Sequence, residues 1–242
     1  WSLDLIQNLP GLNLSKWIQE LEQAVLTEAP HLSIYDLTIE PDTVFGRLHK
    51  KGKLNIPIDS ESQKIDFETT RLLKSRGFAR YEISSYSLPG HASRHNRMYW
   101  SGSGWWGFGM GATSAPWGER FSRPRTIAGY KKWLEQQESQ SLEKTLSIEK
   151  SKSMPLDELL MIGLRRREGI HLEELAKNAG WTQKKCDKNL KSLEKFWLNS
   201  INEGFLLRHN GRYFLSDPKG MQISNQILIQ MFLWWDSLDR DQ

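Results

Sequence analysis

The sequence predicts an α/β fold for the first part of the chain and a small helical, winged-helix-like domain for the last part. Two patterns support this prediction. A strand, a helix and a second strand follow one another within about forty residues, and three later helices precede a hairpin. A polar stretch that is poor in aromatic residues separates the two patterns. The predicted units are therefore residues 1–135, a linker at 136–153, and residues 154–242.

The chain opens with the strand, helix and strand. Trp1 to Ile6 is predicted to be a buried strand, and "NLSKWIQELEQAVL" gathers its apolar residues on one helical face. A β-branched and aromatic run from about Leu32 to Ile39 predicts the second strand. Such a βαβ unit implies a parallel sheet that binds ligands at the carboxyl ends of its strands. Because the chain starts within a strand and without an initiator methionine, we expect it to be a fragment.

Further elements are predicted before the linker. A polar helix runs from Ser60 to Ser75, "FARYEISSYS" predicts one more strand, and "YKKWLEQQ" predicts a short helix. Between that strand and that helix, Ser93 to Gly118 is rich in glycine and shows no periodicity. We therefore expect this segment to be irregular and to bind something.

The last part of the chain predicts a compact helical domain. "LDELLMIGLRRREG" and "LEELAKNAG" predict two helices, and Thr182 caps a third. "FLLRHNGRYFL" predicts a hairpin that turns at Asn210-Gly211. A final helix is predicted from about Pro218 to Trp235. Three helices followed by a hairpin describe a winged-helix-like module.

Composition limits the classes of function. The 242 residues include one cysteine, Cys186, which excludes an internal disulfide and any iron-sulfur cluster held by several thiolates of this chain. The sequence shows no basic and apolar leader and no run long enough to span a membrane, so we expect a cytoplasmic protein without a membrane span. The formal charge of +4 is too small to indicate nucleic acid by itself.

A winged helix that reads DNA with its third helix is one alternative function. The phosphate contacts would be lysines of that helix: Lys184, Lys185, Lys188, Lys191 and Lys195. Residues 154–242, however, hold 13 Lys and Arg against 12 Asp and Glu, whereas the preceding residues hold 20 against 17. A duplex-binding domain normally concentrates basic charge. We therefore expect no nucleic-acid partner, and these lysines are read as a solvated helix face.

His95 is the most informative residue of the glycine-rich segment. A histidine there can be a metal or heme ligand, a general base, or a loop histidine satisfied by backbone groups. Flat apolar side chains surround it in the sequence, and Arg94 and Arg97 could pair with carboxylates at the rim of a large planar ligand. Glycines would let the backbone approach such a ligand. The alternative is an aromatic plug over the open edge of a barrel.

Four stretches together resemble one known family. They are "DLIQNLPG" at 4–11, "YDLTIEPDTVFGR" at 35–47, "GFARYEISSYSLPGHASRHNRMYW" at 77–100 and "GFGMGATS" at 107–114. In this order they look like the HemW family of radical S-adenosylmethionine (SAM) proteins, which are close kin of the oxygen-independent coproporphyrinogen III oxidase HemN. The run "HNRMYW" fits the HNxxYW signature of the HemW branch.

The resemblance implies a fold and a set of cofactors. Members have a partial (β/α) radical-SAM barrel that binds a 4Fe-4S cluster through a CxxxCxxC loop, with SAM beside the cluster. This chain contains no such loop, so it resembles only the later barrel strands, the following extension and the C-terminal domain. HemW proteins are understood to bind heme and to pass it to apoproteins such as respiratory enzymes. Homodimer formation stays open.

The resemblance also implies site residues. The heme-binding residues carry over to His95, Asn96, Tyr99 and Trp100, with His95 as the candidate ligand of the heme iron and Asn96 as one acceptor that could orient its ring. SAM contacts carry over to Asp4, Leu37 and Thr113, and a carboxylate such as Asp4 can accept hydrogen bonds from ribose hydroxyls. The alternative for Asp4 is a residue that caps local backbone amides.

Two other classes of function stay open beside heme delivery. One is an oxidoreductase like coproporphyrinogen dehydrogenase, acting as HemN does, and the other is the winged-helix regulator. The HNxxYW run favours heme delivery over the first, and the upstream βαβ unit counts against the second.

Overall fold

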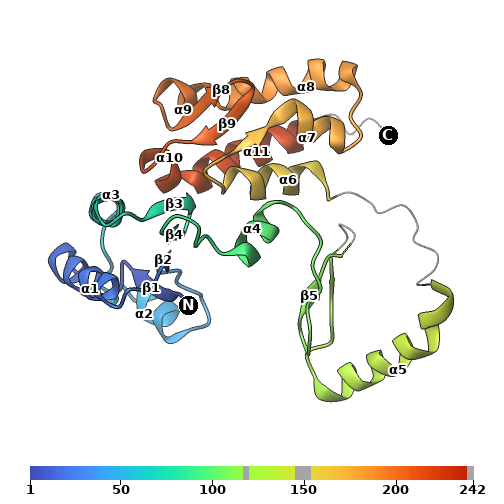
Figure 1. Ribbon diagram of the computed structural model, residues 1–242, viewed down its shortest axis with the longest axis horizontal. Coiled ribbons are helices and arrows are strands. Elements are labelled where there is room, and N and C mark those ends of the chain that lie inside the picture. The colour runs from blue at the N-terminus through green and yellow to red at the C-terminus, as the bar shows by residue number, and fades with distance from the viewer. Residues whose placement is uncertain (117–119, 145–153, 239–242) are drawn as a thin grey trace.

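The structure is a computed structural model that describes residues 1–116, 120–144 and 154–238 (Figure 1). Two hydrophobic cores are present in these residues. One lies under a four-stranded sheet near the N-terminus, and the other fills the C-terminal helical domain. Between them, a short helix and a two-stranded hairpin lead to a long helix that stands apart from both cores (Figure 1).

The N-terminal sheet has the order β1-β2-β4-β3. Strand β1 (Leu3–Gln7) pairs in parallel with β2 (His31–Asp36), and the helix α1 (Leu14–Leu26) connects them, as the sequence predicted. The expectation of a parallel sheet is otherwise wrong. The single strand predicted in "FARYEISSYS" is a tight hairpin of β3 (Ala79–Glu82) and β4 (Ser85–Ser87), and β4 runs antiparallel to β2. No glycine or asparagine marks the turn, so the sequence pattern did not reveal it.

Strand β2 is also shorter than predicted and ends at Asp36. At this end of the strand, the carboxylate of Asp36 accepts hydrogen bonds from the side-chain nitrogens of Gln7 at 2.8 Å and Asn8 at 2.7 Å. The chain then continues irregularly to α2 (Val44–Lys50), a helix that the periodicity did not predict. These bonds join the carboxyl ends of β1 and β2.

The two faces of this sheet differ in polarity. Leu32 and Ile34 of β2 point toward α1 and α3 (Asp59–Ser75), where Trp17 and Leu73 complete a dry core. Side chains alternate along a strand, so the intervening residues face the other way. That opposite face carries the polar residues Asp4, His31, Ser33, Tyr81 and Ser85, beside the exposed Ile6 and Tyr35. A sheet of this kind can pack one face on a core and leave the other open to solvent or a ligand.

The segment after β4 contains more regular structure than predicted. Residues Arg94–Trp100 form helix α4, and β5 (Thr113–Ser114) pairs with β6 (Phe121–Ser122). Helix α5 runs from Ile127 to Lys144, so the first half of the predicted linker is helical, and 145–153 lie outside the described residues. The polar composition of "QQESQSLEK" concealed this helix, because the sequence there shows no apolar stripe that a periodicity search could detect.

The C-terminal domain has the predicted three helices, α6 (Leu156–Leu164), α7 (Leu172–Asn178) and α8 (Gln183–Phe196). The predicted hairpin is also present as β8 (Leu206–His209) and β9 (Arg212–Leu215), with Asn210 and Gly211 at positive φ in its turn. A short strand that was not predicted, β7 (Ile170–His171), adds to β9. Helix α9 (Leu198–Asn202) follows α8, and the predicted last helix is divided into α10 (Lys219–Gln222) and α11 (Ser224–Ser237).

The C-terminal domain joins the sheet at the free edge of β3. The amide of Ile83 donates to the carbonyl oxygen of Arg165 at 3.1 Å, and the amide of Arg167 donates to that of Tyr81 at 3.0 Å. Glu82 and Arg166 form the antiparallel bridge between these two bonds. The segment after α6 therefore covers an edge that would otherwise expose unpaired backbone groups.

Candidate functional site

Helix α4 holds the four residues of the HNxxYW run. It begins at Ser93, whose hydroxyl accepts a hydrogen bond from the amide of Asn96 at 3.2 Å. The helix spacing sorts the four residues into two pairs four apart, His95 with Tyr99 and Asn96 with Trp100. Residues four apart share a helix face, so the two pairs occupy adjacent faces. The sequence could have revealed this from the N-cap serine and the two spacings.

The first pair faces outward. The His95 ring meets the Tyr99 ring edge-on at a centroid distance of 4.8 Å, and Tyr99 in turn meets Trp105 at 4.7 Å. His95 is exposed, whereas Tyr99 and Trp105 are half-buried. An imidazole held against an aromatic edge keeps a preferred orientation while its nitrogens remain accessible.

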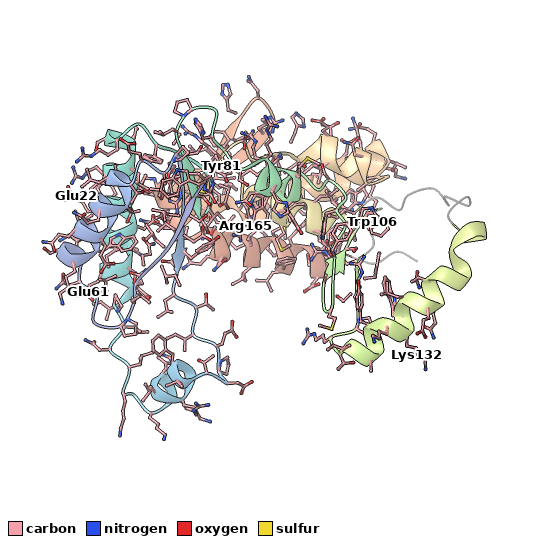
Figure 2. All side chains as sticks on the ribbon, turned by 60° about the horizontal axis from the view of Figure 1, so that its bottom comes forward. Glu22, Glu61, Tyr81, Trp106, Lys132 and Arg165 are labelled. Atoms are coloured by element: carbon pink, nitrogen blue, oxygen red, sulfur yellow. The ribbon has the colours of Figure 1, made fainter. Side chains whose placement is uncertain are left out.

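The second pair faces the protein. The side-chain amide of Asn96 donates to the Tyr81 hydroxyl at 3.4 Å, and the Arg165 guanidinium lies 4.6 Å from the centre of the Trp100 ring. Tyr81 and Arg165 lie beside α4 where the sheet meets the C-terminal domain (Figure 2). Asn96 is thus hydrogen-bonded to Tyr81. We expected Asn96 to orient the His95 ring, but no hydrogen bond between these two side chains is seen in the described residues.

Glycines fold the segment after α4 back on itself. Trp105 and Ala115 exchange backbone hydrogen bonds of 3.3 and 2.9 Å. A Cβ atom at Gly104 would lie 2.3 Å from the carbonyl oxygen of Pro116, and one at Gly107 would lie 2.4 Å from that of Thr113. Glycine at these two positions therefore lets two parts of the backbone approach each other closely. We had expected the glycines to let the backbone approach a ligand instead.

The returning segment exposes apolar side chains. Phe108 is 86% exposed. Trp106 is 52% exposed and lies near β5 (Figure 2). Two methionines share this exposure, Met98 on α4 and Met110 in the segment. Such exposed apolar groups are unusual for a plug that seals a barrel, and they are typical of a surface that binds a ligand or partner.

One of the two predicted arginines is already engaged. Arg97 donates to Glu168 of the C-terminal domain at 2.7 Å and so ties α4 to that domain. Arg94 is exposed at the first position of the helix. Of the two, Arg94 is better placed to meet the carboxylate of a ligand.

Comparison with known proteins finds similar sequences, although no protein-family model matches the chain. The heme chaperone HemW of Synechocystis sp. is 38% identical over 247 residues, which cover 96% of this chain and 58% of that protein. The heme chaperone HemW of Lactococcus lactis is 27% identical over 237 residues, with the same two coverages. This chain is HemW-like. It spans 58% of the length of both relatives.

The fold is that of part of a radical SAM protein. Coproporphyrinogen III oxidase (HemN) from Escherichia coli, a radical SAM enzyme, superposes on the HemW-like chain with a TM-score of 0.67. The superposition covers 95% of this chain and 54% of that one at 13% identity. This likeness concerns the fold alone. It confirms the predicted partial barrel with a C-terminal helical domain.

The residues predicted to contact SAM do not gather in one place. Asp4 is exposed on the polar face of β1 opposite Ser33, and Leu37 follows β2, where its amide donates to the carbonyl oxygen of Gln7 at 3.2 Å. Thr113 lies on β5, apart from β1 and β2 (Figure 1), and its hydroxyl contacts that of Ser122 at 2.8 Å. The described residues of the HemW-like chain therefore bring Asp4 and Leu37 to one sheet and leave Thr113 elsewhere.

The donors of this chain do not fit a 4Fe-4S cluster. Its single cysteine is buried in the C-terminal domain, and within the described ranges no three His, Cys, Asp or Glu side chains converge to hold a metal ion. Cluster ligation by three thiolates would need residues that this sequence does not contain.

Among the helices in the described ranges, none combines the length and apolar composition that crossing a bilayer requires.

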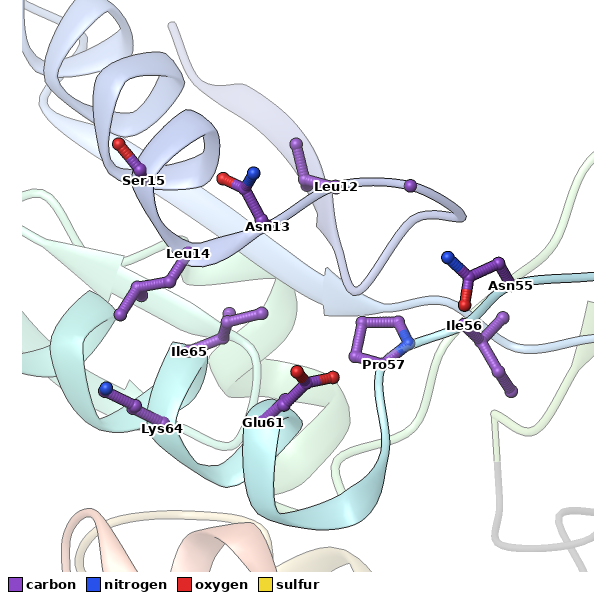
Figure 3. A pocket seen from close by; sticks show the side chains of 11 residues that line it. Leu12, Asn13, Leu14, Ser15, Asn55, Ile56, Pro57, Glu61, Lys64 and Ile65 are labelled. Carbon is purple, nitrogen blue, oxygen red and sulfur yellow. The ribbon is translucent and has the colours of Figure 1, made fainter.

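A cavity of about 630 Å³ lies between the starts of α1 and α3 (Figure 3). None of the predicted site residues lines it. Two of its polar side chains already cap helices, since Asn13 accepts from the amide of Lys16 at 3.0 Å and Glu61 accepts from that of Ile58 at 3.2 Å. These two polar side chains of the cavity therefore stabilise the starts of the two helices.

His31 is a residue of the polar face that sequence reasoning missed. It is 6% exposed, and its Nε2 atom lies 2.8 Å from the Tyr81 hydroxyl. Burial lowers the pKa of His31 below the ordinary value, and the carboxylates of Asp4 and Glu82 oppose this shift only in part. The imidazole is therefore neutral in the folded protein at neutral pH.

This shift predicts a pH dependence of stability. Above about pH 6.5 the imidazole is neutral in both states, whereas below it the unfolded chain takes up the proton first. We expect the free energy of unfolding to fall as the pH drops from 7.5 to 5.5, and to fall less in His31→Gln, whose side chain is neutral at every pH. Denaturant titrations at the two pH values measure this difference. Equal losses in wild type and variant would contradict the shift.

Proposed function

We propose that this chain is the heme-holding part of a cytoplasmic heme chaperone and delivers heme to apoproteins such as respiratory enzymes. The observation that supports this most is an exposed histidine, His95, held at an aromatic edge and next to exposed apolar side chains. A neutral imidazole nitrogen is a good axial ligand for heme iron. The curated relatives named as heme chaperones support the same cargo.

In this proposal one face of α4 binds heme and the other holds the helix against the protein. His95 would ligate the iron, and Tyr99 would orient its ring and offer an apolar edge to the macrocycle. Asn96 and Trp100, which the family resemblance places among the heme residues, would instead hold the helix against Tyr81 and Arg165. Arg94 would pair with a propionate. A single axial bond on an exposed helix permits release, which a carrier requires.

SAM binding belongs to the same proposal at the polar face of the sheet. The residues fit a nucleoside in part, because Asp4 offers an exposed carboxylate beside Ser33 and close to His31, whose buried Nδ1 atom has no hydrogen-bond partner among the described residues. When bound with a cluster, SAM supplies radical chemistry. The residues of this chain would only hold the ribose of SAM, through acceptance of hydroxyl hydrogen bonds by Asp4. The 4Fe-4S cluster would need ligands from outside this sequence.

Titration of the chain with hemin, followed by absorbance, tests the proposal. We expect stoichiometric binding with a histidine-ligated Soret band, and at least about tenfold weaker binding in His95→Ala, equivalent to ~1.4 kcal/mol. His91→Ala is the matched control, because His91 is also exposed and precedes α4. Iron-free protoporphyrin separates ligation of the metal from stacking of the ring.

Two outcomes would contradict the assignment of His95. One is unchanged heme affinity and spectrum in His95→Ala, and the other is an equal loss in His91→Ala. Tight binding of protoporphyrin that does not depend on His95 would favour the second candidate function, a HemN-type porphyrinogen oxidoreductase, which the likeness to HemN suggests. The absence of nucleic-acid binding stays a prediction, and homodimer formation stays open.

A further inference from the structure

Helix α4 lacks the usual means of staying in place. It has seven residues, and none of them is buried. A helix this short is marginal by itself, and most helices in proteins are stabilised by packing an apolar face. The position of α4 must therefore depend on a few specific contacts.

Three contacts hold α4 at its inner side. Arg97 pairs with Glu168, but both side chains are about half exposed, at 54% and 46%, so this pair contributes little. Trp100 lies under the Arg165 guanidinium. The third contact is the bond from Asn96 to the hydroxyl of Tyr81, whose side chain is 9% exposed. Of the three, only this one reaches the sheet.

The Tyr81 hydroxyl is itself held from the opposite side. The same oxygen lies 2.8 Å from Nε2 of His31, and a hydroxyl can accept from Asn96 while it is hydrogen-bonded to the ring. The other ring nitrogen of His31, Nδ1, is buried without a hydrogen-bond partner among the described residues. The chain of contacts thus runs from β2 through β3 to the residue next to His95.

We propose that Tyr81, supported by His31, is a positioning residue for heme. Residues 95 and 96 are adjacent on a helix, so the contact that fixes the rotation of Asn96 also fixes the direction of the His95 side chain. Loss of the hydroxyl leaves α4 free to turn and fray, and His95 then meets the iron in several orientations. The heme part of this proposal rests on the proposed function, whereas the anchoring of α4 does not.

Tyr81→Phe tests the proposal because it removes one oxygen and keeps the ring. Tyr86→Phe is the matched control: Tyr86 is 1% exposed, and its hydroxyl bonds to Thr70 at 2.9 Å in the core on the other side of the sheet. Tyr81→Phe loses the bonds to His31 and Asn96, and Tyr86→Phe loses the bond to Thr70, but only Tyr81 contacts α4. A change shared by both variants is a general effect on stability.

The first measurement is hydrogen exchange without heme. The amides of Arg97 and Ser101 report on α4, since they donate to Ser93 and Arg97 at 3.0 Å. We expect about five- to tenfold faster exchange at these amides in Tyr81→Phe and less than about a twofold change in Tyr86→Phe. Equal exchange of α4 in the two variants would overturn the proposal, whether or not the chain binds heme.

The second measurement is the hemin titration. We expect Tyr81→Phe to bind about five- to tenfold more weakly and to give a broadened or mixed Soret band, while Tyr86→Phe keeps the spectrum of wild type. If wild type binds no heme, the proposed function fails and the exchange result still decides the role of Tyr81. If wild type and Tyr81→Phe bind alike, Tyr81 is not a positioning residue for heme.

Asn96→Ala keeps the test decisive if Tyr81→Phe does not fold. Asn96 is only half-buried, and alanine has the higher intrinsic helix propensity. If propensity alone held α4 together, exchange at Arg97 would slow in this variant. If the bond to Tyr81 holds it, exchange speeds up, so the sign of the change separates the two explanations.

Discussion

Arg80→Met is expected to lower the free energy of unfolding by ~3–5 kcal/mol, because it leaves a buried carboxylate without its partner. Arg80 is 6% exposed and donates to Asp66 of α3 at 3.1 Å and to Asp217 of the C-terminal domain at 3.4 Å. Its Nε and Nη2 atoms also donate to the carbonyl oxygen of Ile83 at 2.9 and 2.6 Å. One guanidinium thus forms hydrogen bonds both to the N-terminal part of the chain and to the C-terminal domain.

The electrostatics around Arg80 favour its charged form. Burial by itself lowers the pKa of the guanidinium, but the neighbouring Tyr86, Asp66 and Asp217 outweigh it and raise the pKa above the ordinary value. The group therefore stays charged in the folded state. Methionine fills a similar volume but provides neither charge nor donors, so Asp66 would have to protonate or take up water.

Arg71→Met is the control, since Arg71 also pairs with a carboxylate, that of Glu68, at 2.6 Å, but its side chain is 67% exposed. Exposed pairs of this kind contribute ~0–1 kcal/mol. Denaturant unfolding, followed by both fluorescence and circular dichroism, measures the two losses. Similar losses in the two variants would show that the Arg80 cluster does not stabilise the junction of the two cores.

Gly169→Ala is the second large effect, with an expected loss of ~2–5 kcal/mol from left-handed backbone strain and a steric clash. Gly169 has a φ of 63°, and a Cβ atom there would lie 2.0 Å from the carbonyl oxygen of Tyr213 and 2.6 Å from Cβ of Phe214. Either β7 moves away from β9 or the backbone of β9 shifts. Both changes disturb the pairing of Ile170 with Tyr213.

Gly180→Ala isolates the steric part of this loss. Gly180 also has a positive φ, 84°, but nothing lies within 4 Å of a Cβ atom built there. This variant should lose only the strain energy of ~1–2 kcal/mol. If Gly169→Ala costs no more than Gly180→Ala in denaturant unfolding, the close approach of β7 to β9 is not rigid.

Sequence reasoning found the elements whose signals are local. The apolar face around Trp17 predicted α1, and the Asn210-Gly211 pair predicted the turn between β8 and β9. It failed where a strand was divided by an unmarked turn at Ile83, and where α5 continues beyond the short helix predicted in "YKKWLEQQ" into a polar stretch without an apolar stripe. Neither the turn nor the second half of α5 carries the local sequence pattern that such a prediction needs.

The candidate site divides in the same way. The HNxxYW run and the resemblance to HemW proteins singled out the residues of α4 from the sequence alone. That His95 and Tyr99 face outward while Asn96 and Trp100 face the protein required the helix and its neighbours. His31 could not be identified from the sequence because its partner Tyr81 is 50 residues away along the chain.

By itself, the sequence determined most of the helices and strands and the residues that carry the family likeness, because these depend on patterns within a few turns or strands. Only the tertiary structure decided how the parts meet. Arg80 finds Asp217 at a separation of 137 residues, and β3 finds its edge partner at Arg165–Arg167. Such contacts form because buried charges and strand edges must be satisfied somewhere in the folded chain, and no local pattern says where.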